Sequence, residues 1–239
     1  MRRFFAPIES FTDEVVTLDA DETRHLRDVL RLRTGDRVSV FDGAGGEFAC
    51  DILKIEKRSS LLKIVEPVEP SSPESSLDLT LAMAMLKHDR FDLVIQKAVE
   101  LGVTRLVPLD VIRFDVRGKD ALKRIDRWRR IAFEATKQCG RAQLMAIAEP
   151  QPFTSVMANA DPFEAVMFSE KEGGQLPAAV GNGKITAFIG PVGGWDDSEL
   201  KAARDRGIPT VTLGGRILRA ETAAISIAAI LQHRFGDLN

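Results

Sequence analysis

The sequence predicts an α/β protein of two domains, a small β-barrel over residues 1–70 and a larger α/β domain over residues 77–239. Between them, residues 66–76 read EPVEPSSPESS, with three prolines and four serines. Such a composition cannot build a core and favours extended backbone, so it predicts a linker. Short alternating strands precede this linker, and strands that alternate with helices follow it. This change of rhythm predicts two separate cores.

The N-terminal domain is predicted from its alternating segments. Residues 37–41 (RVSVF) and 47–55 (EFACDILKI) alternate between apolar and polar side chains, and the glycine-rich residues 42–46 between them predict a hairpin turn. Residues 61–65 add a strand, and residues 21–30 predict a helix with acidic residues in its first turn. Small barrels of this kind often bind nucleic acid, although a fold alone does not establish a function.

After the linker, short apolar segments alternate with amphipathic ones. The predicted strands cover residues 79–85, 105–109, 165–168, 186–189 and 210–213. The predicted helices cover residues 89–101, 121–138, 198–206 and 221–235. This alternation predicts a mostly parallel sheet with helices on both faces. Ligands bind such sheets outside the carboxyl ends of the strands, so the loops that follow the strands are the candidate sites.

Charge is distributed unevenly along the chain. The net charge of −2 and the pI of about 6.0 argue against a general polyanion binder. However, residues 113–130 carry eight Lys or Arg against three Asp, and residues 24–37 carry five Arg against two Asp. Each cluster alone is explained by a solvated helix face. Together they favour a partner that carries phosphate groups, because guanidinium groups match phosphate oxygens.

The two cysteines, Cys50 and Cys139, lie far apart and have no partners at metal-ligand spacing, and the three histidines are equally dispersed. This usage favours a reducing compartment and predicts neither a disulfide scaffold nor a metal site. No apolar run approaches the length of a membrane span, and residues 1–6 (MRRFFA) and those that follow do not resemble a signal peptide. We therefore expect a soluble cytoplasmic protein that does not bind a membrane.

A first glycine-rich loop follows the predicted strand at residues 186–189 and reads IGPVGGW over residues 189–195. Its glycines allow tight turns or the close approach of a ligand. Asp196, with Glu199 three residues later, is typical of a capping box that begins a helix. The loop matches neither a Walker A motif nor the GxGxxG motif. From the residues alone, it is either an ordinary turn between strand and helix or a ligand-binding loop.

A second glycine-rich loop, LGGRILR over residues 213–219, precedes the final helix. Arg219 and Glu221 lie at the start of that helix, where burial of charge costs free energy unless the charges have partners. They are either a structural ion pair or functional residues. The helix itself is apolar nearly all round, so it is buried or packs against another chain.

Five segments together resemble one known family. They are RHLRDVLRLRTGDRV (Arg24–Val38), LKHDRFDLVIQKAVELGV (Leu86–Val103), RWRRIAFEATKQCGR (Arg127–Arg141), FIGPVGGW (Phe188–Trp195) and LGGRILRAETAA (Leu213–Ala224). In this order and spacing they resemble the bacterial 16S rRNA (uracil-N3)-methyltransferases, which belong to the SPOUT superfamily. The resemblance covers nearly the whole chain.

The resemblance implies an N-terminal PUA-like RNA-binding barrel and a C-terminal SPOUT domain with a deep trefoil knot. It also implies a homodimer that uses S-adenosyl-L-methionine and acts on 16S rRNA of the small ribosomal subunit. The two glycine loops would surround the cofactor and bind its adenine mainly through backbone groups. The implied cofactor-binding residues are Phe168, Gly190, Pro191, Gly193, Gly194, Leu213, Gly214, Ile217, Leu218 and Ala223.

Methylation of uracil N3 requires loss of the N3 proton and alignment of the nitrogen with the sulfonium methyl group. Arg219 is the candidate for stabilising the uracil anion or holding the base. Glu221 is the candidate for orienting Arg219 or accepting the proton, and the sequence leaves these roles open. The candidates for binding RNA phosphates are Arg24, Arg27, Arg31, Arg117 and Arg141.

The chain departs from the family pattern at several positions. Val192 stands where glutamate is usual in the first glycine loop, Cys139 where serine is common, and Ala220 where threonine is common. Residues 112–117 match the usual Glu-Arg-Ser pattern only loosely. The loss of a carboxylate at Val192 points to one alternative, an RNA-binding factor without catalysis. A separate alternative is a SPOUT methyltransferase that acts on another RNA.

Overall fold

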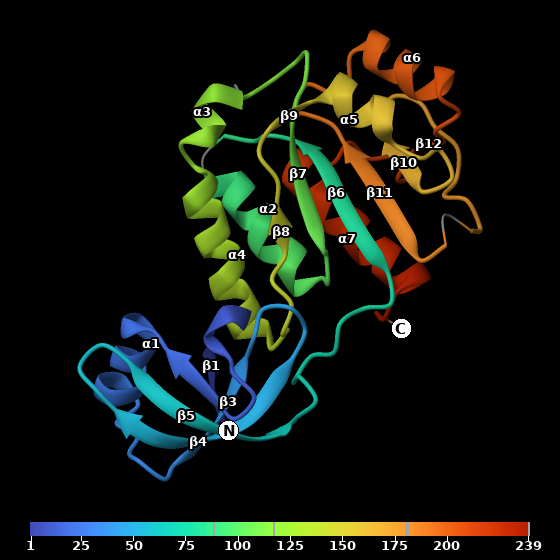
Figure 1. The fold of residues 1–239 in the computed structure, drawn as a ribbon. Coiled ribbons are helices and arrows are strands. Elements are labelled where there is room, and N and C mark those ends of the chain that lie inside the picture. Colours follow the sequence, from blue (N-terminus) through green and yellow to red (C-terminus); the bar gives the residue numbers. More distant parts are fainter. Residues whose placement is uncertain (88, 117, 180–181, 239) are drawn as a thin grey trace. The chain divides into compact units, whose positions relative to one another are not determined.

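The structure is a computed structural model that describes residues 1–87, 89–116, 118–179 and 182–238 (Figure 1). The chain forms two compact units. Unit 1 is Met1–Glu74 with Thr136–Leu144, and unit 2 is Ser75–Ala135 with Met145–Asn239. The boundary at Glu74 lies within the residues predicted as a linker. Thr136–Leu144, however, belongs to unit 1, although the predicted larger domain included it.

Polar contacts explain why Thr136–Leu144 belongs to unit 1. The Arg3 guanidinium donates to the carbonyl oxygen of Arg141 at 2.6 Å. Arg141 in turn forms an ion pair with Glu74 at 2.7 Å, and Lys137 Nζ donates to Glu22 Oε1 at 2.5 Å. These are contacts between residues far apart in sequence, so no local pattern predicts them.

Unit 1 is built on a five-stranded sheet in the order β1-β3-β4-β5-β2. β1 and β3 are parallel, and the other pairs are antiparallel. The strands are β1 (Arg2–Phe5), β2 (Val15–Leu18), β3 (Arg37–Phe41), β4 (Glu47–Ile55) and β5 (Ser60–Pro67). A 3-10 turn at Ile8–Ser10 precedes β2. The predicted helix is α1 (Ala20–Arg24), which Asp19 caps and which continues into a π-helical turn (His25–Val29).

The core of unit 1 receives side chains from all five strands and from the helical segment. Phe4 of β1 and Val16 of β2 lie at opposite edges of the sheet, yet they pack in one buried cluster with Leu26 and Ile52. The sheet therefore bends around its core, as predicted for a small barrel, with β1 and β2 as its two edges.

Cys50 lies in this core, and burial raises the pKa of its thiol to about 12. At pH 8 roughly one thiol in 10⁴ is then ionised, and the thiolate is the reactive form. We expect Cys50 to resist alkylation by iodoacetamide at pH 8 and to react fully in urea. A Cys139→Ala variant, in which Cys50 is the sole cysteine, allows mass spectrometry to measure this. Labelling of the native variant as fast as a free thiol would contradict the prediction.

Unit 2 is built on a parallel sheet, as the sequence predicted. The sheet has seven strands, two more than the five predicted. The order is β12-β10-β11-β6-β7-β8, and β9 also pairs with β7. All of these pairs are parallel. The strands are β6 (Asp78–Ala84), β7 (Arg105–Asp110), β8 (Ala146–Ile147), β9 (Gln151–Pro152), β10 (Ala165–Phe168), β11 (Lys184–Ile189) and β12 (Thr210–Val211).

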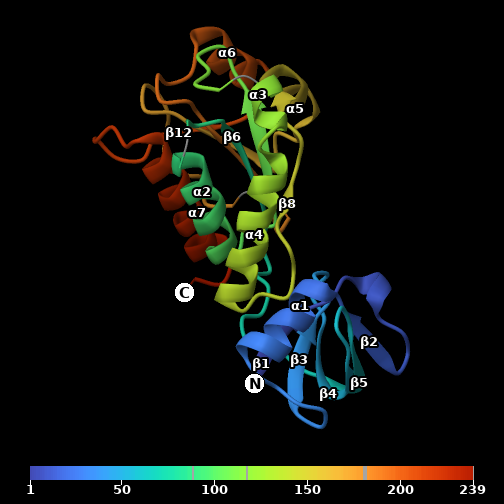
Figure 2. The ribbon, with the colours of Figure 1, turned by 90° about the vertical axis from the view of Figure 1, so that its left-hand side faces the viewer.

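Helices cover both faces of this sheet (Figures 1 and 2). On one face lie α2 (Asp89–Glu100) and α7 (Ala220–Phe235), which contact each other, and α7 also contacts β6 and β11. α4 (Ile125–Cys139) packs on α2 through Trp128 and Phe91. The other face carries α5 (Phe153–Asn159) and α6 (Asp197–Asp205). The predicted helix at residues 121–138 is divided into α4 and the short α3 (Gly118–Leu122), with a turn between them.

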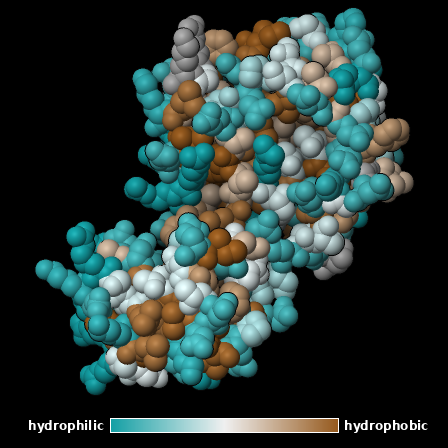
Figure 3. Space-filling model, in the orientation of Figure 1, coloured by the Kyte–Doolittle hydropathy of each residue, from teal (hydrophilic) through white to brown (hydrophobic). Residues whose placement is uncertain are grey.

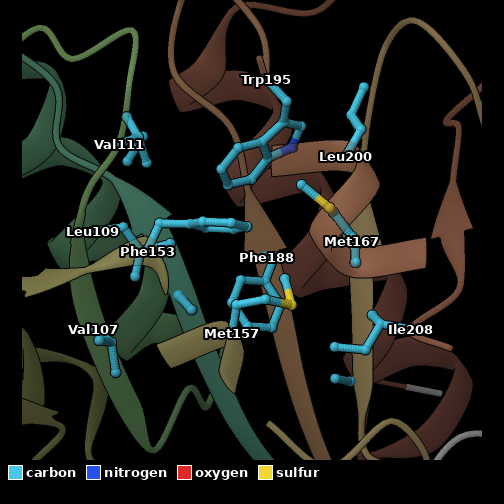
Figure 4. Close-up of a cluster of buried hydrophobic side chains, with 14 residues drawn as sticks. Val107, Leu109, Val111, Phe153, Met157, Met167, Phe188, Trp195, Leu200 and Ile208 are labelled. Atoms are coloured by element: carbon cyan, nitrogen blue, oxygen red, sulfur yellow. The ribbon is translucent and has the colours of Figure 1, made fainter. Parts of the chain in front are cut away.

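The core under α5 and α6 ends at an indole ring (Figure 4). Trp195 is fully buried and contacts Phe153 of α5, with ring centroids 5.2 Å apart. Phe153 also packs against Phe188 of β11 at 6.1 Å. Trp195 is the last residue of the first glycine loop, so this ring joins the hydrophobic core to the loop. In the described residues no helix is both long and apolar enough to cross a membrane.

Candidate functional site

A cavity of about 510 Å³ lies at the carboxyl ends of β10, β11 and β12. The loops that follow these strands and the first turns of α7 form its walls. This is the position predicted for a ligand in a parallel sheet, and the volume lies in the range of small-molecule sites. Its lining consists of residues 168–170, 189–193, 211–220, Ala223 and Ile227.

The first glycine loop is shaped by Trp195. The indole Nε1 donates to the carbonyl oxygen of Phe168 at 2.8 Å, which ties the end of the loop to β10. A Cβ atom on Gly190 would lie 3.0 Å from Nε1, so only glycine fits there without displacing the ring. Gly194 has a φ of +68°, which a side chain would strain. The glycines therefore allow the loop to pass closely over the indole.

Arg113 and Asp196 hold the outer side of this loop. The Arg113 guanidinium donates to the carbonyl oxygen of Gly193 at 3.1 Å and to Asp196 Oδ2 at 3.4 Å. Asp196 caps α6 in the predicted capping box with Glu199. Hydrogen bonds from Ser198 to its carboxylate lower the pKa of Asp196 below the usual value. Asp196 is therefore ionised at neutral pH and available to Arg113.

The strand before the second glycine loop is held on both of its edges. β12 pairs with β10 on one side. On its other side Gly174 donates to the Thr210 carbonyl oxygen at 2.9 Å and accepts from the Thr212 amide at 3.2 Å. Thr212 Oγ1 also donates to the Ser169 carbonyl oxygen at 3.1 Å. Residues 169–174 therefore form an arch that runs from one edge of β12 to the other.

Glycine is required where the arch crosses β12. A Cβ atom on Gly173 would lie 2.7 Å from the carbonyl carbon of Val211 and 2.8 Å from the Thr212 amide nitrogen. These are backbone atoms, which cannot rotate away as a flexible side chain can. Past the arch, Gly214 has a φ of +65° and, with Gly215, is exposed. The second glycine loop is thus fixed at its root and open at its tip.

Nine of the ten predicted cofactor residues line the cavity, and Gly194 is the exception. The three loops that carry them lie far apart in sequence and meet only in the folded sheet. The lining also contains residues that the sequence did not single out. Among them are Ser169, Glu170, Thr212, Arg216 and Ile227. Their only signal in the sequence was proximity to a strand end or to a glycine loop.

The two predicted catalytic residues lie in different surroundings. Arg219 is the residue before α7, is exposed and lines the cavity. Glu221 lies in the first turn of α7 and is only 9% exposed, and its Oε2 has no hydrogen-bond partner among the described residues. Within that part of the chain Arg219 and Glu221 form no ion pair. The interpretation of the two residues as a structural ion pair is therefore not supported.

The predicted RNA-binding arginines of unit 1 lie on or next to its helical segment. Arg24 is 68% exposed and pairs with Asp21 at 3.1 Å. Arg27 donates to Asp28, and this hydrogen bond lowers the pKa of the Asp28 carboxyl. Arg31 is exposed and is held at a φ of +54°.

Arg141 does not fit its predicted role. Its side chain is only 3% exposed, and its guanidinium is held by the Glu74 carboxylate through two donors, at 2.9 and 2.7 Å. A buried guanidinium that is paired in this way is not accessible to RNA phosphates, so the prediction for Arg141 is corrected. Arg117, the remaining candidate, lies outside the described residues.

Hydrophilic side chains cover much of the face shown in Figure 3, with hydrophobic ones between them. Among the exposed large hydrophobic residues are Leu93 of α2 and Ile230 of α7. The two helices that carry these side chains, α2 and α7, contact each other. Val192 and Ile217, which line the cavity, are exposed as well.

The chain matches two known domain families. Residues 73–232 match an RNA methyltransferase domain, and residues 18–65 match an RNA methyltransferase PUA domain. Among full-length relatives, the ribosomal RNA small subunit methyltransferase E of Synechocystis sp. is 32% identical and covers 93% of this chain and 74% of its own length. The protein of the same name from Rickettsia conorii is 31% identical and covers 90% of this chain and 88% of its own length.

Solved structures of related proteins are also similar to this chain. The ribosomal RNA small subunit methyltransferase E from Neisseria gonorrhoeae, bound to S-adenosylmethionine, superposes with a TM-score of 0.88 at 31% identity and covers 100% of both chains. A protein from Legionella pneumophila, solved in complex with the same cofactor, has a TM-score of 0.85 at 29% identity. The match covers 99% of this chain and 98% of the Legionella chain.

Proposed function

The chain belongs to the ribosomal RNA small subunit methyltransferase E family, and from this membership we propose that it methylates N3 of a specific uridine in 16S rRNA. The methyl donor is S-adenosylmethionine, and the substrate is rRNA of the small ribosomal subunit. The observation that carries the proposed methylation is the cavity formed by the loops after β10, β11 and β12. We further propose that the protein works in the cytoplasm.

The residues around the cavity fit this cofactor. The close packing of Gly190 on the Trp195 ring leaves backbone groups, rather than side chains, facing a ligand at that turn. Phe168, Leu213, Leu218 and Ala223 provide apolar surface for an adenine ring. We propose that Gly190, Pro191, Gly193, Gly214 and Ile217 complete the binding site and that Gly194 shapes the turn. The bound cofactor supplies an electrophilic methyl group on a sulfonium.

Arg219 is the residue that we propose stabilises the uracil anion. Its guanidinium extends from the rim of the cavity and has no ion pair within the described residues. Loss of the N3 proton leaves a negative charge on the pyrimidine, which a nearby cation stabilises. N3 lies on the Watson–Crick edge, so the base has to be unpaired or flipped out. We propose Glu221, with its unpartnered Oε2, as the proton acceptor rather than as the residue that orients Arg219.

We also propose that unit 2 contains a deep trefoil knot. The arch of residues 169–174 supports this, because it runs from β10 on one edge of β12 to Gly174 on the other edge. The chain then forms α7 on the face of the sheet opposite to α6. A strand end that passes beneath an earlier loop is the arrangement that such a knot requires.

We also propose that the protein forms a homodimer. The exposed Leu93 and Ile230 on α2 and α7 support it, since apolar side chains on adjacent helices favour burial against another chain. The final helix is rich in alanine and isoleucine, as expected for a helix that is covered on more than one side.

Arg24 and Arg31 are proposed to bind RNA phosphates together with Arg27. We expect the double variant Arg24→Gln, Arg31→Gln to bind small-subunit rRNA more weakly, and to lower the slope of log affinity against log salt by about one to two. Filter binding at several salt concentrations measures both quantities. Arg37→Gln is the matched control, because Arg37 is already held by Asp51 at 2.8 and 3.1 Å. An unchanged salt slope in the double variant would refute the assignment.

The proposed function is tested by mapping methylated nucleosides in rRNA. In a strain that lacks this protein we expect loss of 3-methyluridine at one site of 16S rRNA, detected by mass spectrometry of nuclease fragments. The purified protein with S-adenosylmethionine should restore it. Loss of a different modified nucleoside would favour another RNA target. Unchanged rRNA, together with no binding of S-adenosylmethionine in calorimetry, would favour an RNA-binding factor without catalysis.

A further inference from the structure

The geometry points to Glu170 as the residue that binds a cationic group of the methyl donor, its sulfonium or its α-ammonium. The inference rests on the proposed function, since it concerns the same cavity. Glu170 follows β10 and lines the cavity. The sequence contains no motif around it, and only the folded structure brings it to the site.

The charges around the cavity are separated by loop. Among the described lining residues, Glu170 is the one that carries a carboxylate, and it comes from the loop after β10. The basic side chains, Arg216 and Arg219, both come from the loop after β12. S-adenosylmethionine carries two cationic groups and one carboxylate. A cavity with a negative and a positive side therefore matches the charges of this molecule.

The first glycine loop leaves space for the Glu170 carboxylate. A Cβ atom on Gly194 would collide with Glu170 Oε1, and the φ of +68° at Gly194 also favours glycine. Glycine at this position thus allows the carboxylate to lie directly against the turn. Val192 of the same loop is uncharged, so the loop itself brings no acid to the cavity. Glu170 supplies the negative charge at this position.

The backbone around Glu170 is fixed, while its carboxylate has no partner among the described residues. The Lys171 amide donates to Ser169 Oγ at 3.1 Å, and the Ser169 carbonyl oxygen accepts from Thr212 Oγ1 at 3.1 Å. Lys171 Nζ is bonded to the Trp195 carbonyl oxygen, and Glu172 is paired with Arg204. The side chains of Lys171 and Glu172 are therefore engaged in contacts within unit 2. The Glu170 carboxylate makes no hydrogen bond or ion pair with the described residues and is free for a ligand.

A carboxylate in this position favours a cation over a neutral group of the same shape. Hydrogen bonds and ion pairs that involve ionised groups are stronger than neutral ones, and a bound ligand excludes water from the contact. An effect of this origin depends on the charge of the ligand. It is absent for a ligand that keeps the adenosine but lacks both cationic groups.

The test compares three ligands by isothermal titration calorimetry with the full chain and with Glu170→Gln. S-adenosylmethionine carries both cationic groups, S-adenosylhomocysteine keeps only the ammonium, and 5′-methylthioadenosine has neither. We expect Glu170→Gln to weaken the binding of S-adenosylmethionine about five- to tenfold and to leave the affinity for 5′-methylthioadenosine unchanged. If Glu170→Gln weakens the binding of S-adenosylhomocysteine by the same factor, the ammonium is the bound group. If the affinity for S-adenosylhomocysteine is unchanged, the sulfonium is the bound group.

Glu172→Gln is the matched control, because Glu172 lies two residues away, pairs with Arg204 and does not line the cavity. We expect it to bind all three ligands normally, and both variants to keep the melting temperature of the unaltered protein. Equal weakening of all three ligands by Glu170→Gln, or no weakening of S-adenosylmethionine, would overturn this inference alone. Failure of the unaltered protein to bind S-adenosylmethionine would overturn the proposed function with it.

Discussion

Replacement of Arg219 by alanine is expected to slow methyl transfer to small-subunit rRNA by about 100- to 1000-fold, as does the loss of one donor to a developing anion in other enzymes. Arg219 lies at the rim of the cavity and makes no side-chain hydrogen bond that caps α7. Its removal therefore takes a cation from the reacting base without loosening the helix. Single-turnover transfer from radiolabelled S-adenosylmethionine measures the rate.

Two measurements separate this role from a structural one. Calorimetry should show that Arg219→Ala still binds S-adenosylmethionine, and the melting temperature should be unchanged. Arg219→Lys keeps the charge but not the planar fork of donors, so we expect it to recover part of the lost rate. Full activity of Arg219→Ala would rule out the catalytic assignment. A parallel loss of cofactor binding would assign Arg219 to the cofactor instead.

The largest effect on stability is expected at Trp195. Substitution by alanine leaves a cavity beside Phe153 and removes the hydrogen bond to Phe168, and we expect it to cost about 3–5 kcal/mol in the free energy of unfolding of unit 2. The same change removes the surface on which Gly190 packs. S-adenosylmethionine should therefore bind at least tenfold more weakly, in line with a cost of about 1.4 kcal/mol or more. Urea denaturation and calorimetry measure the two effects.

Trp128 provides the matched control for Trp195. It is also buried, but it packs on Phe91 of α2 and does not line the cavity. Trp128→Phe should lower stability without changing the affinity for S-adenosylmethionine. Trp195→Phe should lower both, because it leaves the Phe168 carbonyl oxygen without its donor. If the two variants weaken cofactor binding equally, the loss reflects general destabilisation and the role of Trp195 in shaping the loop is wrong.

The sequence predicted those elements whose pattern repeats over several residues. The strands at residues 37–41 and 47–55 alternate, and the helix at residues 89–101 has a continuous apolar face, so each was predicted close to its bounds in the structure. β1 and β2 were missed because RRFF and VVTL are not fully apolar runs, unlike the four-residue strand at residues 165–168, and are too short to show an alternation. α5 was missed because FTSVMAN contains no charged residues to mark a polar face.

For the candidate site, glycine was the useful signal. Both glycine loops were identified because tight turns after strands restrict the side chains that fit. The partners of charged residues were beyond prediction, since they depend on contacts between distant segments. Arg141 was predicted to bind RNA phosphates, but its partner in the structure is Glu74, 67 residues away. Glu170 showed no signal beyond its position just after a predicted strand, because only the fold places it in the cavity.

The arch of residues 169–174 also determines how the site exchanges its small molecules. Hydrogen bonds on both edges of β12 prevent this strand from peeling away from the sheet, so fraying cannot open the cavity. The exposed residues 214–217 beyond the arch contain two adjacent glycines, whose backbone is less restricted than that of other residues. We therefore expect release of the spent cofactor to occur by a movement of this short tip about a rigid root. Such a movement makes rapid turnover compatible with a tightly constrained fold.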